Sequence, residues 1–109
     1  MNIVSLGKIR VTNPGTPVPL SATPLMVAKV RVQAVIGETG RVFLGERPSF
    51  NKASGVGVIK EFWPTGVGGG RADEFELDAT SRGNVIDLSK LYLDANVAGE
   101  GAIVSYCQR

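Results

Sequence analysis

The chain has 109 residues, which is enough for one hydrophobic core and too few for two cores side by side. Its formal charge is +2 and its basic residues are scattered along the sequence, which argues against a dedicated nucleic-acid-binding protein. Histidine is absent and Cys107 is the only cysteine, which excludes histidine-based catalysis, a disulfide framework within the chain and a cysteine-based metal site.

Alternating apolar and polar residues predict β-strands, because successive side chains of a strand point to opposite faces. The first strand is predicted within 6–12, where Ile9 and Val11 share a face. Four prolines within 13–24 then predict an extended surface arm or an edge segment. The clearest alternation, at 26–35, predicts a long strand. Its predicted buried face consists of Met26, Ala28, Val30, Val32 and Ala34.

The middle of the chain continues this pattern. The sequence GETG at 37–40 predicts a hairpin from the long strand to another strand at 41–46. The sequence PTGVGGG at 64–70 predicts a flexible glycine-rich loop. A further strand is predicted at 74–78, where two apolar residues alternate with three acids.

The last third predicts one helical turn near 87–90 and a final strand at 101–107, whose inward residues would be Ala102, Val104 and Tyr106. Six to eight short strands, joined by turns containing glycine and proline, predict an all-β protein. We therefore expect residues 1–109 to form a single-domain antiparallel β-sandwich, with a jelly roll as the preferred arrangement.

The sequence DANVAGEG at 94–101 resembles a cation-binding loop, because Asp94, Asn96 and Glu100 crowd one turn. An EF-hand loop would also need oxygen ligands at two positions that Ala98 and Ser105 occupy, and alanine offers none. A hairpin is favoured instead, in which an aspartate or asparagine side chain bonds the backbone and a glycine takes positive φ. Whether the stretch binds a cation stays open.

The glycine-rich sequence GVGGGR invites comparison with a phosphate-binding loop. Such a loop needs a lysine followed by serine or threonine and then a helix, whereas here an acidic, strand-like segment follows. A loop that orders against a neighbouring subunit is therefore favoured over nucleotide binding.

The acids of 74–78 could supply a glycosidase pair, which requires two carboxylates facing each other across a cleft. Glu74, Glu76 and Asp78 instead share one face of a single strand. The favoured interpretation is a solvated face on which these acids meet Lys29 and Arg31 of a neighbouring strand.

Trp63 is the only tryptophan and stands beside Phe62. A buried anchor beneath the glycine-rich loop is one interpretation. A stacking platform for a sugar or an energetic centre of a protein interface are the functional alternatives, because tryptophan is favoured in both roles. The core or an interface is favoured over a ligand.

Three segments resemble small virion proteins of tailed bacteriophages. NVIDLSKLYLDANVAGEGAIVSYCQR at 84–109 is similar to their closing segment, GKIRVTNPGTPVPLSAT at 7–23 to their opening, and GETGRVFLGE at 37–46 to their middle hairpin. The resemblance implies a non-enzymatic β-sandwich subunit of a phage particle. Its implied role is a head decoration (cement) protein that stabilises the capsid shell, with a tail, fibre or adaptor component as the alternative.

The implied partners are the major capsid protein or other virion subunits, together with further copies of the chain, a trimer being favoured. No cofactor, metal, nucleic acid or membrane partner is expected. The opening residues lack a signal-peptide pattern, so we expect synthesis in the host cytoplasm. The resemblance implies a final place in the virion. A small carbohydrate-binding module using Trp63 and Tyr92 remains an alternative. The expected contact residues are Pro14, Pro17, Val18, Pro19, Leu20, Phe62, Trp63, Arg71 and Tyr92.

Overall fold

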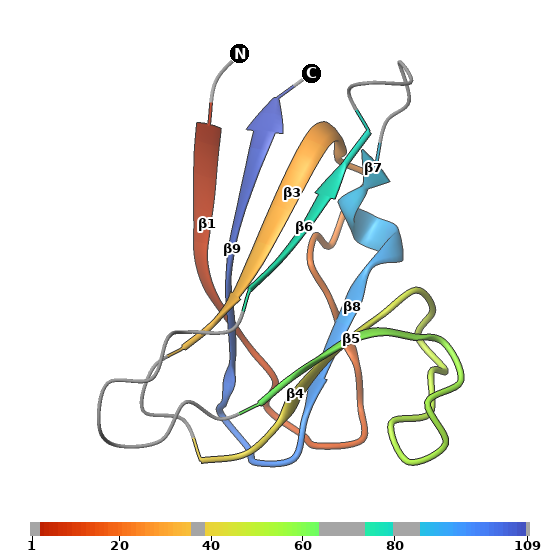
Figure 1. The fold of residues 1–109 in the computed structure, drawn as a ribbon. Coiled ribbons are helices and arrows are strands. Elements are labelled where there is room, and N and C mark those ends of the chain that lie inside the picture. Colours follow the sequence, from red (N-terminus) through yellow and green to blue (C-terminus); the bar gives the residue numbers. More distant parts are fainter. Residues whose placement is uncertain (1–2, 36–38, 64–73, 80–85, 109) are drawn as a thin grey trace.

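Two antiparallel β-sheets packed face to face make up the computed structural model, which describes residues 3–35, 39–63, 74–79 and 86–108 (Figure 1). No α-helix occurs in these residues, so the predicted all-β sandwich is confirmed. The elements in chain order are β1 (Ile3–Arg10), β2 (Val18–Pro19), β3 (Met26–Ala34), β4 (Val42–Gly45), β5 (Val58–Phe62), β6 (Glu74–Asp78), β7 (Ile86–Asp87), the 3-10 helix η2 (Leu88–Lys90), β8 (Tyr92–Ala95) and β9 (Gly101–Gln108).

Sheet A has the strand order β1-β9-β3-β6, and β7 also pairs with β3. Sheet B has the order β2-β8-β4-β5. In the described part of the chain, β4 and β5 are the only consecutive strands that pair with each other. Two predicted hairpins, at 37–40 and 94–101, are therefore wrong, because each of these connections crosses from one sheet to the other. The strand pairings establish two antiparallel sheets. The jelly-roll arrangement of these sheets stays a prediction.

The core lies between the sheets. Ala102, Val104 and Tyr106 are buried in it, so the inward face predicted for the final strand is confirmed. The long strand β3 departs from strict alternation at its start, because Met26 is exposed and Val27 is buried. The register with β9 shifts between Val27 and Lys29, which marks a β-bulge. A bulge inserts one extra residue, so it reverses which side chains face inward.

The predicted helical turn is confirmed as η2, with Asp87 as its N-cap. The Asp87 carboxylate accepts hydrogen bonds from Ser89 N at 2.9 Å and Ser89 Oγ at 2.7 Å, and these bonds lower its pKa. The proline-rich arm supplies β2 at one edge of sheet B, as an edge segment was predicted to do. The glycine-rich loop at 64–70 lies outside the described residues. No helix in the described ranges has the length and apolar character needed to cross a membrane.

Candidate functional site

At one end of the sandwich, the connection between β8 and β9 contacts two other connections through backbone hydrogen bonds. Asn96 N donates to Arg41 O at 3.0 Å, and Gly99 N donates to Val11 O at 2.8 Å. Val11 N in turn donates to Glu100 O at 2.9 Å. The connections that follow β1, β3 and β8 therefore meet there. We call residues 11–17, 39–41 and 96–100 the loop end.

The Glu100 side chain fixes part of the loop end. Its carboxylate accepts hydrogen bonds from Thr39 N and Gly40 N, both at 2.8 Å, and from Thr39 Oγ1 at 3.1 Å. Burial raises the pKa of Glu100, but these hydrogen bonds and the charge of Lys8 outweigh burial and lower the pKa overall. The carboxylate therefore acts as a charged acceptor that holds the segment before β4 against the β8–β9 connection.

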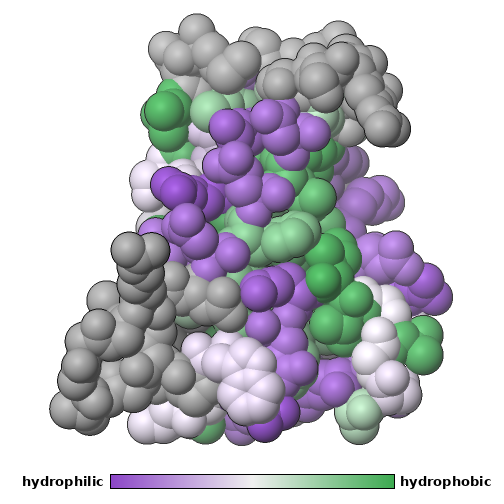
Figure 2. Space-filling view, viewed as in Figure 1, coloured by the Kyte–Doolittle hydropathy of each residue, from purple (hydrophilic) through white to green (hydrophobic). Residues whose placement is uncertain are grey.

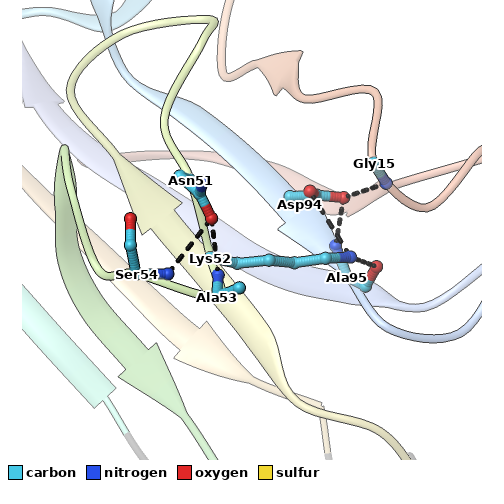
Figure 3. A network of polar contacts seen from close by, with 7 residues as sticks. All are labelled: Gly15, Asn51, Lys52, Ala53, Ser54, Asp94 and Ala95. Atoms are coloured by element: carbon cyan, nitrogen blue, oxygen red, sulfur yellow. Dashed lines mark hydrogen bonds and ion pairs between the residues drawn. The ribbon is translucent and has the colours of Figure 1, made fainter.

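Asp94 is a second fixed acid, and Figure 3 shows it between Gly15 and Lys52. Its neighbours Leu93 and Ala95 belong to the core, so Asp94 points to the outer face of sheet B. It is only 2% exposed. Its Oδ1 accepts from Gly15 N at 2.9 Å and from Ala95 N at 2.8 Å, while Lys52 Nζ lies 3.6 Å from its Oδ2. Lys52 also donates to Ala95 O at 3.0 Å. Asp94 thus joins the arm, through Gly15, to the β4–β5 loop, through Lys52.

The β4–β5 loop, residues 46–57, covers part of the outer face of sheet B. Its Phe50 is buried, and a Cβ added to Gly45 would lie 2.2 Å from Phe50 Cδ1, so the ring lies directly on the backbone of β4. The Asn51 side chain accepts from Ala53 N at 2.9 Å and Ser54 N at 3.1 Å, which closes a local turn. The loop is therefore a packed layer over the sheet.

The possible cation ligands of the β8–β9 connection have separate partners. Asp94 bonds Gly15 and Lys52, whereas Glu100 bonds Thr39 and Gly40. No group of three or more aspartate, glutamate or cysteine side chains suited to a metal occurs within the described residues. As expected, a backbone N–H donates to an acid of this stretch, since Ala95 N donates to Asp94 Oδ1, and Gly99 has a positive φ, at 82°. The stretch acts as a structural tie between the sheets.

Trp63 directly follows β5 and is 55% exposed, so the interpretation as a buried anchor is wrong. The alternation of β5 explains this, because Phe62 points into the core and its neighbours Glu61 and Trp63 point outward. The guanidinium carbon of Arg41 lies 3.6 Å from the centre of the Trp63 ring system, and Arg41 Nη1 lies 2.8 Å from Glu61 Oε1. We call Arg41, Glu61 and Trp63 the tryptophan cluster.

The outer face of sheet A is charged and internally paired, as predicted. Lys29 Nζ lies 3.3 Å from Glu76 Oε1 and 4.0 Å from Asp78 Oδ2, and Arg31 Nη2 lies 3.1 Å from Glu74 Oε1. Figure 2 shows hydrophilic side chains gathered over the region of β3 and β6. The three acids share one strand and meet cations of the next strand, which supports the solvated-face interpretation over a glycosidase pair.

A small hollow of about 220 Å³ lies on this same face. Ligand pockets usually occupy about 300 to 1,000 Å³, so the hollow is smaller than that range. It is lined by Ile3, Lys29, Arg31, Glu76, Ser105, Tyr106 and Cys107.

The expected contact residues are spread over several places. Leu20 and Phe62 are buried in the core, so their side chains offer no surface to a partner, and both are corrected to core residues. Arg71 lies outside the described residues. Exposed or half-buried positions on the arm, on β8 and after β5 hold Pro14, Pro17, Val18, Pro19, Tyr92 and Trp63.

Sequence reasoning missed Arg41 and Lys52, which complete the tryptophan cluster and the Asp94 contacts. A single basic residue outside any motif carries no signal of its own. For Arg41, the usable signal is its position two residues before Phe43. Side chains two residues apart in a strand point to the same face, so Arg41 is expected to point outward with Phe43.

The chain matches no protein-family model, no curated protein and no solved structure.

Proposed function

We propose that the chain is a non-enzymatic structural subunit of a phage particle, namely a head decoration protein that docks on the shell of the major capsid protein. The proposal rests on the resemblance of its opening, middle and closing segments to small phage virion proteins, together with the surface that the fold presents. In this role the protein is made in the host cytoplasm and ends in the virion.

The tryptophan cluster is the observation that carries the proposal. Trp63 is more than half exposed, yet Arg41 lies on its ring and Glu61 holds Arg41 in place. The indole is therefore preorganised, so docking would cost little further side-chain entropy. Tryptophan and arginine are the residue types most enriched among the energetic centres of protein interfaces. The cluster is internally neutral, which suits an apolar contact surface on the partner.

The two acids with shifted pKa values support a structural role. Asp87 caps η2 and Glu100 holds the loop end, and hydrogen bonds lower the pKa of both. A general acid working near neutral pH needs a raised pKa, so neither group suits that task. Their carboxylates instead serve as acceptors that rigidify the connections.

We further infer a jelly-roll arrangement. The strand orders β1-β9-β3-β6 and β2-β8-β4-β5 place four principal strands in each sheet, and every paired strand runs antiparallel to its neighbour. The chain passes repeatedly from one sheet to the other, as two interlocked Greek keys require. In this interpretation β7 is a short addition beside β3.

The proposal is tested by co-sedimentation with empty shells assembled from the major capsid protein encoded on the same phage genome. We expect the wild-type chain to pellet with the shells and Trp63→Ala to lose at least about 2 kcal/mol of binding free energy, as interface centres do. Val56→Ala is the matched control, because Val56 is an apolar residue that is 58% exposed and lies outside the tryptophan cluster. A wild-type chain that stays in the supernatant would refute docking on the shell.

The same exposed indole favours a second candidate, a small carbohydrate-binding module, because sugars stack on exposed aromatic rings. Titration with simple hexoses, hexosamines and their oligomers, followed by the fluorescence of Trp63, separates the two candidates. A saturable change with a sugar and no binding to shells would assign the carbohydrate role. Binding to purified tails instead of shells would assign the fibre or adaptor role.

A further inference from the structure

Arg41 and Trp63 stand at the same end of sheet B, each one residue beyond the paired part of its strand. The register of β4 begins at Val42, which is paired with Phe62 of β5 and Ala95 of β8. Arg41 precedes Val42, and Trp63 follows Phe62. The two residues whose contact forms the tryptophan cluster therefore lie outside the registered pairs of the sheet, and their positions depend on other contacts.

The β8–β9 connection supplies such contacts on both sides of Arg41. Asn96 N donates to Arg41 O at 3.0 Å, which holds the carbonyl side of the residue. On the other side, the Glu100 carboxylate accepts from Thr39 N and Gly40 N, both at 2.8 Å. Figure 1 shows the start of β4 beside this connection. One acid side chain therefore fixes the segment that leads into Arg41.

Gly40 brings the two connections into direct contact. A Cβ at this position would lie 2.7 Å from Val97 Cγ2 and 3.2 Å from Glu100 Oε1, which is closer than side chains normally approach. The absence of a side chain thus lets the backbone N–H groups reach the carboxylate. Hydrogen bonds to an ionised group are stronger than those between neutral groups. The contact is therefore both close and strong.

A continuous series of contacts leads from Glu100 to the exposed indole. The carboxylate holds the backbone next to Arg41, and the Arg41 guanidinium carbon lies 3.6 Å from the centre of the Trp63 ring system. Glu61 holds the far end of Arg41, at 2.8 Å from its Nη1. We propose that Glu100 is a positioning residue of the tryptophan cluster, which sets where Arg41 stands and so how the Trp63 ring is covered.

Acrylamide quenching of Trp63 in the free protein tests this positioning. Arg41 covers one face of the only indole in the chain, so a displaced guanidinium opens that face to the quencher. We expect Glu100→Gln to raise the quenching constant, because an amide offers one oxygen where the carboxylate offers two. Glu76→Gln, at an exposed acid on the outer face of sheet A, is the matched control and should leave the constant unchanged. An unchanged constant in Glu100→Gln would overturn the proposal.

A double-mutant cycle separates positioning from a general loosening of the fold. Arg41→Ala uncovers the ring outright, so it should raise the quenching constant by more than Glu100→Gln does. If Glu100 acts through Arg41, adding Glu100→Gln to Arg41→Ala should raise the constant no further. Increments that add in the double variant would show that Glu100 acts on Trp63 by another route, and they would overturn the proposal. Circular dichroism confirms that each variant is folded.

Glu100→Asp is a milder second variant, because it keeps the negative charge that interacts with Lys8. Its side chain is shorter by one methylene group, so from the same backbone position its carboxylate cannot reach both Thr39 N and Gly40 N. We expect a raised quenching constant here as well. A wild-type constant in Glu100→Asp would contradict the role given to the hydrogen bonds.

Shell binding tests the consequence for docking, which rests on the proposed function. A long side chain that is no longer held must be ordered again on binding, so Glu100→Gln should raise the dissociation constant for shells by about twofold to tenfold. Trp63→Ala should raise it further. If Trp63→Ala weakens docking and Glu100→Gln does not, Glu100 has no part in docking, while the docking proposal stands. If the wild-type chain does not bind shells, the docking proposal fails, and the quenching cycle alone decides the positioning role.

Discussion

The outer faces of the two sheets are built in opposite ways. On sheet A the outward side chains of β3 and β6 form exposed ion pairs, such as Arg31 with Glu74. On sheet B the β4–β5 loop and the arm lie over the sheet, so that Phe50 and Asp94 are buried on its outer side. Exposed ion pairs contribute little to stability, whereas truncating a buried ring, or removing one partner of a buried charge, is costly. The sandwich thus has one solvated outer face and one covered outer face.

The largest expected effect is the loss of the ring that covers sheet B. Phe50→Ala should lower the free energy of unfolding by about 3 to 5 kcal/mol, because it removes a buried phenyl ring from contact with Gly45. Urea titration followed by circular dichroism measures the change. A loss below about 1 kcal/mol, which is typical of exposed surface positions, would show that the β4–β5 loop is not a packed layer.

Asp94 should give the next largest effect. Asp94→Ala removes the acceptor for Gly15 N and leaves Lys52, which is partly buried, without its carboxylate. We expect a loss of about 3 kcal/mol, the scale found when one partner of a buried pair is removed. The same urea titration measures it. Faster amide exchange at Gly15 should accompany the loss, and unchanged exchange there would contradict the tie between Asp94 and the arm.

Glu100 gives a smaller and pH-dependent effect. Its folded-state pKa lies below its ordinary value of 4.5, so the unfolded chain binds the proton more readily than the folded one. The stabilisation from Glu100 is therefore complete above that value and is lost as the pH falls through the folded-state pKa. Glu100→Gln should flatten the fall in melting temperature as the pH is lowered below 4.5. Glu46→Gln, at an exposed acid, is the control, and equal slopes for both variants would contradict the hydrogen bonds to Thr39 and Gly40.

The smallest effect should come from the solvated face. Arg31→Ala breaks the exposed contact with Glu74 and should change the free energy of unfolding by less than about 1 kcal/mol. Added salt should alter the wild-type and variant proteins almost equally. A loss comparable to that of Asp94→Ala would mean that the two outer faces do not differ as described.

The same contrast explains how much could be predicted from the sequence. The alternation in β3, β6 and β9 revealed the strands, the inward faces and the cross-strand pairing of Lys29 and Arg31 with acids, because one face of sheet A is solvated. All four residues of β4 are buried, because a loop covers its outer side, so alternation there could not tell inward from outward.

The errors have similar physical causes. The two false hairpins came from short connections, whose length does not reveal whether the chain stays in one sheet. Met26 was misplaced because a bulge has no sequence signature of its own. Phe62 was wrongly expected at a contact surface, because the parity of β5 directs it into the core and leaves Trp63 exposed. The partners of Asp94 are far apart in the sequence, so they required the fold.

The fluorescence of Trp63 during docking tests the account most directly, because the chain contains no other tryptophan. Titration with shells of the major capsid protein should shift the emission to shorter wavelength and protect the indole from acrylamide quenching. Docking is expected to bury the exposed ring in the contact. The Val56→Ala control should behave as the wild type does. Shells that bind the chain while the emission and the quenching stay unchanged would contradict the assignment of the tryptophan cluster as the docking anchor.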